Sequence, residues 1–120
     1  MHVHGPRVQQ QVLAARGVSL ERSVAVAVDA GKAEAVALVA DFTGERLCPP
    51  VLFAMNRDGI AALVQRVDAA VAGRGAGVVR VAVEASGYHL PLLARGVLPV
   101  SWTIVELNPA HVAMQRRVNG

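Results

Sequence analysis

Two acidic residues each follow a largely apolar segment that is typical of a buried β-strand. Asp29 comes directly after residues 24–28, and Glu84 comes directly after residues 78–83. An acid at the carboxyl end of such a strand lies where open α/β sheets bind their ligands. If the two strands are parallel neighbours, the side chains of Asp29 and Glu84 meet at one edge of the sheet.

Two carboxylates that meet at such an edge are stable together only under certain conditions. At a separation of about 4–6 Å they repel each other, and partial burial raises that cost. The pair is stable when one acid is protonated or when a cation lies between them. Oxygen ligands without a nearby His or Cys favour Mg²⁺ or Mn²⁺ over zinc. The pattern alone leaves two interpretations open, a divalent-metal site at Asp29 and Glu84 or two acids that only cap strand ends.

Other polar residues near these acids are weaker candidates. Lys32 is the single lysine of the chain and is either a solvated turn residue or a phosphate contact. Ser86 lacks the glycine two residues before it that a nucleophile elbow needs, and we expect it to be a helix N-cap. Tyr88 and His89 are expected to be ordinary residues of a first helical turn.

The elements that position these residues follow from hydrophobic spacing. Alternating apolar residues predict strands, and apolar residues at Ile60, Leu63 and Val67 predict an amphipathic helix capped by Asn56 or Asp58. The predicted order is β-β-β-α-β-α-β-α. Its strands are expected near residues 24–28, 33–40, 47–54, 78–83 and 100–105, and its helices near 58–72, 87–95 and 109–117.

This order indicates the fold class and the domain organisation. Three consecutive strands followed by alternating helices and strands predict an α/β fold with a mixed five-stranded sheet and helices packed on it. Residues 1–22 are expected to be a polar N-terminal arm, and residues 23–120 one folded domain. Pro49 and Pro50 cannot donate to a strand ladder, which makes the third strand an edge strand.

Composition excludes several classes of protein. Apolar residues make up 53% of the 120 residues, which is too many for a disordered chain. No apolar stretch approaches the roughly 18–20 residues that span a bilayer, so we expect no membrane partner. The polar start shows no signal peptide, and the single Cys48 fits a reducing cytoplasm. A net charge of +3 does not by itself decide whether the chain binds nucleic acid.

Three short motifs carry a resemblance to a known family. They are Val-Asp-Ala-Gly-Lys at residues 28–32, Val-Glu-Ala-Ser-Gly at 83–87 and Leu-Asn-Pro at 107–109. In this order and spacing, with a hairpin after the first, they resemble the N-terminal domain of the DEDD transposases. These belong to the one-ten group of bacterial insertion sequences and are related to the Piv-type invertases. The similarity runs from about residue 24 to residue 120.

The resemblance implies a fold, an activity and partners. The fold is RuvC-like, that is ribonuclease-H-like, with the first and fourth strands as parallel neighbours. The family's active site is an Asp, a Glu and two further Asp residues that hold Mg²⁺ or Mn²⁺ for attack on DNA phosphodiesters. Its first Asp matches Asp29 and its Glu matches Glu84, which are therefore the expected catalytic and metal-binding residues. The implied partners are DNA and a structured guide RNA.

The chain also departs from the family pattern. Ser86 stands where the family usually has Thr, and the last two Asp residues normally follow a basic segment like residues 115–120, where this chain ends. The resemblance therefore predicts a domain truncated before its last acidic motif and inactive alone. Lys32, Ser86, Arg116 and Arg117 are the expected nucleic-acid contacts. Apolar surface left exposed by the truncation makes a homo-oligomer the expected state.

Two other functions are compatible with parts of the sequence. Sugar kinases and actin-like ATPases also begin with an Asp-x-Gly hairpin that contacts phosphate, and residues 28–44 fit that pattern. Against this, 120 residues are too few for their second phosphate loop and adenosine site. A non-enzymatic assembly module is the third interpretation, in which Asp29 and Glu84 have a structural role only.

Overall fold

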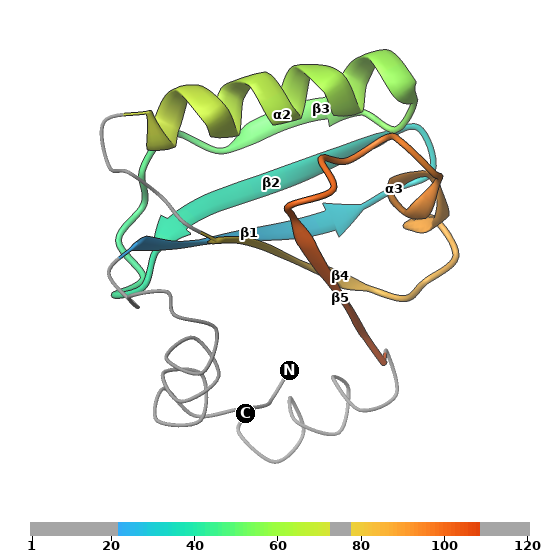
Figure 1. Cartoon of the computed structure of the whole chain (residues 1–120). Coiled ribbons are helices and arrows are strands. Elements are labelled where there is room, and N and C mark those ends of the chain that lie inside the picture. Colours follow the sequence, from blue (N-terminus) through green and yellow to red (C-terminus); the bar gives the residue numbers. More distant parts are fainter. Residues whose placement is uncertain (1–21, 73–77, 109–120) are drawn as a thin grey trace.

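The computed structural model describes residues 22–72 and 78–108 (Figure 1). The expected N-terminal arm lies outside these residues except for Arg22. The last predicted helix, with Arg116 and Arg117, lies outside them as well. The predictions for these two segments therefore stay predictions, and the fold below is that of the segment between them.

Five strands form one mixed sheet in the order β3-β2-β1-β4-β5. Strand β2 is antiparallel to both β1 and β3, whereas β4 is parallel to both β1 and β5. The predicted mixed five-stranded α/β sheet is confirmed, with the third strand at one edge. The bounds are Ser23–Ala30 for β1, Glu34–Asp41 for β2, Val51–Ala54 for β3, Val78–Glu84 for β4 and Thr103–Leu107 for β5.

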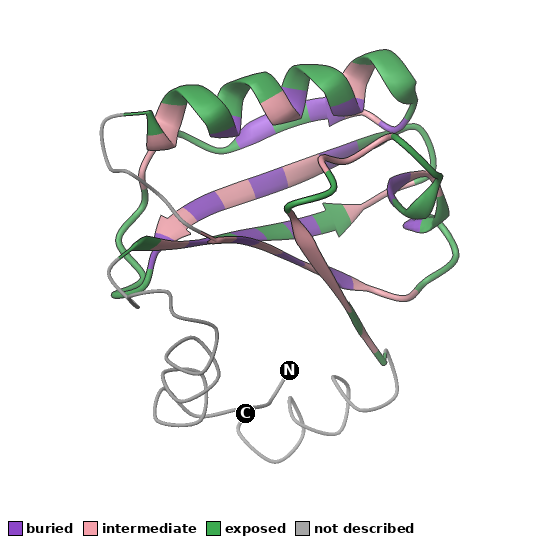
Figure 2. Cartoon of the chain, viewed as in Figure 1, coloured by how far each residue is buried: buried purple, intermediate pink, exposed green. Residues whose placement is uncertain are grey.

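The core lies on one face of this sheet, against helix α2 (Arg57–Val71). Alternate strand residues point to opposite faces, and Figure 2 shows buried residues alternating with more exposed ones along β1 and β2. Helix α2 contributes Ile60, Leu63 and Val67, all of them fully buried. The strand residues of the core share this face and include Val24, Val26 and Val28 on β1 and Val79, Val81 and Val83 on β4.

The second face of the sheet differs from the expectation. The sequence predicted that β1 is buried on both faces, but Ala25 and Ala27 are exposed. The short helix α3 (Leu90–Leu93) places Leu92 in the same core cluster as α2. Within residues 22–72 and 78–108, both helices therefore pack against the same face of the sheet, and no helix covers the other face. We call this second surface the open face.

Helix α2 begins where the sequence placed its cap. The Asn56 side chain accepts a hydrogen bond from the Gly59 backbone N–H at 2.8 Å, which satisfies one of the unpaired donors of the first turn. The helix then runs beside β3 (Figure 1). This approach is close, because a Cβ atom on Gly59 would lie 2.0 Å from the Ala54 carbonyl oxygen. Glycine is therefore required at the point where α2 meets the sheet.

The second helix is shorter than the predicted span of residues 87–95. Gly87 has a φ of 100°, outside the helical region, so the chain enters α3 only at Leu90. The expectation that Ser86 caps this helix is wrong, because His89 is at the N-cap and Ser86 is exposed. Neither described helix is long and apolar enough to cross a membrane.

Two strands are displaced from their predicted bounds. The third strand was expected from residue 47 but begins at Val51, because Pro49 and Pro50 offer no N–H for the ladder. Only an isolated bridge joins Arg46 to Ala40 before that point. The fifth strand was expected from residue 100 but begins at Thr103, where pairing with Arg80 of β4 starts.

Replacing Gly59 with Ala tests the close approach of α2 to β3. The added methyl group must displace the Ala54 carbonyl, and overpacking of this kind costs about 1–3 kcal/mol. We expect the free energy of unfolding, measured by urea titration, to fall by that amount. The control Gln65→Ala, at an exposed site of the same helix, should change it by less than about 0.5 kcal/mol. Equal effects of the two substitutions would contradict the packing described.

Candidate metal centre

The two candidate acids directly follow the last paired residues of the neighbouring strands β1 and β4. The predicted parallel pairing of these strands is confirmed, and its last paired residues are Val28 and Val83. Asp29 and Glu84 are the next residue on each strand, and adjacent strands lie about 4.8 Å apart. Since Val28 and Val83 are buried in the core, the next residue on each strand, Asp29 and Glu84, belongs to the open face.

Apolar residues flank the acid pair on both sides. Asp29 is paired with Val36 of β2, and Val36 with Leu52 of β3. On the other side, Glu84 is paired with Leu107 of β5. The registers thus give two short rows, one that ends at Asp29 and one that begins at Glu84, on neighbouring strands. The first row is Leu52, Val36 and Asp29, and the second is Glu84 and Leu107.

The two carboxylates are available to bind a ligand. Among the described residues, neither acid has a side-chain hydrogen bond or an ion pair. Asp29 is exposed and Glu84 is half-buried. The described part of the chain holds no group of three or more His, Cys, Asp or Glu side chains placed to bind a metal. This pair therefore offers two carboxylates, and a bound Mg²⁺ would take its remaining oxygen ligands from water or from a phosphate.

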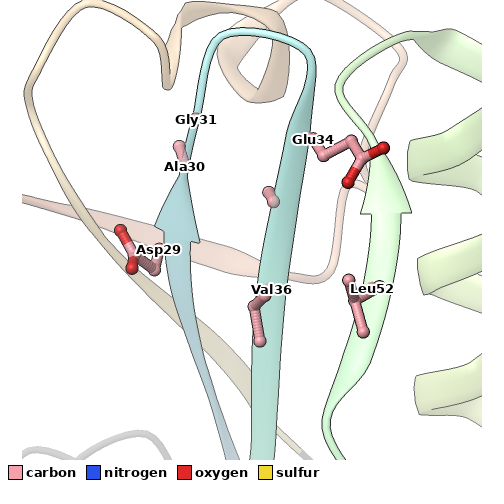
Figure 3. Close-up of a pocket in the computed structure, with 7 residues that line it drawn as sticks. Asp29, Ala30, Gly31, Glu34, Val36 and Leu52 are labelled. Carbon is pink, nitrogen blue, oxygen red and sulfur yellow. The ribbon is translucent and has the colours of Figure 1, made fainter.

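A shallow pocket of about 220 Å³ opens beside Asp29, on the β2 side. Most of its lining residues are apolar, and Figure 3 shows Val36 on the strand between Asp29 and Leu52. The close-up shows the Glu34 side chain on the β3 side, away from that of Asp29. Glu34 therefore does not add a third oxygen ligand to the Asp29–Glu84 pair.

The backbone after Glu84 is fixed by hydrogen bonds to β5 and within its own loop. The Ala85 N–H donates to the Leu107 carbonyl at 2.8 Å, which extends the β4–β5 ladder past the acid. The Ser86 N–H donates to the Glu84 carbonyl at 2.9 Å. Gly87 then turns the chain with its positive φ, so that the loop leaves the sheet directly after Glu84.

His89 joins this loop to β5 and was not recognised from the sequence. Its side chain is buried, and its Nδ1 accepts a hydrogen bond from the Gly87 N–H at 3.2 Å. The proton of the neutral ring is therefore assigned to Nε2, which donates to Glu106 Oε2, also at 3.2 Å. Neither residue looks unusual in sequence, because their contact depends on how α3 folds back towards β5.

The other predicted site residues lie in a turn, in a loop or outside the described residues. Lys32 is exposed at the β1–β2 turn, and Ser86 is exposed in the loop after Glu84. Arg116 and Arg117 lie outside the described residues. Sequence reasoning also missed Arg80, which shares the open face with Glu84 and whose Nε atom is buried without a hydrogen-bond partner. An arginine inside an otherwise apolar strand was the available signal.

Comparison with known proteins adds no identification. No protein-family model and no curated protein matches this chain. The argument for a function therefore depends on the geometry of the acid pair and on the three motifs that surround it.

The His89 bridge can be tested by stability. His89→Leu removes both hydrogen bonds of a buried imidazole, to the Gly87 N–H and to Glu106, and should lower the free energy of unfolding by about 1–3 kcal/mol. The control Tyr88→Leu changes the exposed neighbouring side chain and should have an effect below about 0.5 kcal/mol. Urea titration of both variants measures the difference. An unchanged stability in His89→Leu would show that the bridge does not hold the loop.

Proposed function

We propose that this chain is the N-terminal, metal-binding part of a DNA transposase or recombinase of the DEDD type, with a ribonuclease-H-like fold. The observation that carries the proposal is the parallel pairing of the central strands β1 and β4 up to Val28 and Val83, the residues directly before Asp29 and Glu84. The motifs at residues 28–32, 83–87 and 107–109 support it, since the first two contain these acids. The third begins at Leu107, which is paired with Glu84.

The donor set fits a divalent cation. Two carboxylates on neighbouring strands, without partners among the described residues, are free to take a cation between them, and oxygen ligands favour Mg²⁺ or Mn²⁺. When bound, such an ion activates a water or hydroxyl nucleophile and stabilises the leaving oxygen of a phosphodiester. Asp29 and Glu84 hold the ion at the sheet edge, and Lys32, at the neighbouring turn, contacts a backbone phosphate.

The same geometry limits what the chain does alone. A metal clamp for phosphoryl transfer needs more oxygens than two carboxylates supply, and the family provides two further Asp residues. We therefore assign to this chain the metal-holding half of an active site. Its DNA and guide-RNA partners, like its cofactor, belong to this proposal.

The first test measures metal binding directly. In a Mn²⁺ titration followed by electron paramagnetic resonance, the chain should bind one ion weakly. Asp29→Asn and Glu84→Gln, which keep the side-chain shape but remove the charge, should each lower the affinity at least about tenfold, since even outer-shell changes cost that much. The control Asp68→Asn, at an exposed site of α2, should leave the affinity unchanged.

Two outcomes of that test would contradict the proposal. One is a Mn²⁺ affinity that is the same in all three variants and the unaltered chain. The other is a rise in melting temperature with Mg²⁺-ATP that Mg²⁺ alone or Mg²⁺ with DNA does not produce, which would support an ATPase-type phosphate-binding domain instead.

A second test measures activity on DNA. Incubated with Mg²⁺ or Mn²⁺, the chain should leave supercoiled and branched DNA intact, because two carboxylates supply too few oxygen ligands for a metal clamp. Asp29→Asn, purified in the same way, reveals any contaminating nuclease. Strong nicking by the unaltered chain that is lost in Asp29→Asn would overturn the view that two carboxylates are insufficient.

A further inference from the structure

On the open face, β4 carries two opposite charges at equal distances on either side of Ala82. Arg80, Ala82 and Glu84 alternate with the buried valines and therefore all lie on the open face. The positive and the negative residue are each two positions from Ala82. They are about 13 Å apart along the strand, too far to pair with each other, and no ion pair between them is formed.

A row of small and aliphatic residues crosses the sheet through Ala82. The registers pair Leu38 with Ala27, Ala27 with Ala82, and Ala82 with Val105. Ala27 is exposed, as is Ala25 two residues before it. Side chains this small allow a second layer to approach closely, and two stacked sheets pack about 10 Å apart.

Arg80 shows that the open face lacks a partner group. Its Nε atom is buried, yet it has no hydrogen bond within the described residues. A buried donor without an acceptor costs about 1–3 kcal/mol. The acid pair has the converse deficit, because Asp29 and Glu84 have no cationic partner within the described chain. Within the described residues, the open face thus carries both a cationic side chain whose Nε atom has no acceptor and acidic side chains without a cation.

We propose that the open face binds the open face of a second copy of this chain. The two-fold axis passes through the Ala82 row, in the plane between the sheets and perpendicular to β4. This symmetry places Arg80 of each copy against Glu84 of the other, so that two ion pairs flank an apolar centre. A two-fold axis parallel to the strands would instead stack acids on acids. The pairing needs no metal, and because it uses Glu84 it competes with a metal ion held by Asp29 and Glu84.

The test is a charge exchange on β4, read by sedimentation velocity in EDTA over a wide range of protein concentration. The unaltered chain should be a dimer. Arg80→Glu and Glu84→Arg each place like charges together and should raise the dissociation constant at least about tenfold, because like charges across an interface cost several kcal/mol. The control Arg66→Glu makes the same charge change on the exposed side of α2 and should leave the dimer intact.

Two further samples separate the ion pairs from general damage to the fold. The double variant Arg80→Glu/Glu84→Arg restores opposite charges and should dimerise again. An equimolar mixture of the two single variants should form a heterodimer, because the glutamates of one copy then meet the arginines of the other. Recovery in these samples supports the proposal even if a single variant is less stable by circular dichroism.

Three results would overturn the dimer. A monomer at every concentration would show that another part of the chain or solvent covers the open face. A dimer that persists in both single variants would place the interface elsewhere. Failure of both the double variant and the mixture to associate would show that the loss in the single variants came from unfolding. The absence of metal in the buffer keeps each result separate from the metal-binding test.

Discussion

The parallel pairing of β1 with β4 is the constraint on which the site depends. It sets Val28 beside Val83 and therefore places Asp29 and Glu84 directly after them on neighbouring strands, although the two strands are separated by two further strands and a helix. Because successive side chains of a strand point to opposite faces, both acids then lie on the face opposite to that of the two valines. A register shift of one residue in either strand would move one acid along the edge and turn alternate side chains to the other face.

The division of the sheet into a packed face and an open face follows from the same alternation. On the packed face the strands carry mainly valine, which fits against Ile60, Leu63 and Val67 of α2. On the open face β1 carries alanine, followed by the acid. Because burying an unpaired charge is costly, the acids are found on the face that the described helices leave uncovered.

Local patterns in the sequence were sufficient to predict most elements. Alternating valines predicted β1 and β4, the apolar spacing predicted α2, and Asn56 was one of the two caps predicted for it. What local patterns could not supply are contacts between distant segments. Alanine at 25 and 27 is equally compatible with a buried and an exposed strand face, so the open face was missed. His89 and Glu106 approach only through the path of α3, which Gly87 and Pro91 make shorter than its apolar residues suggest.

The topology also has a kinetic consequence. Strands β1, β2 and β3 follow one another directly and pair as neighbours, so their contacts close short loops and can form early. The β1–β4 pairing instead joins segments separated by β2, β3 and α2, and non-local pairing of this kind is intrinsically slow. A partly folded chain that contains only the three-stranded meander has Asp29 without Glu84. We therefore expect the two acids to come onto neighbouring strands only after the meander has formed.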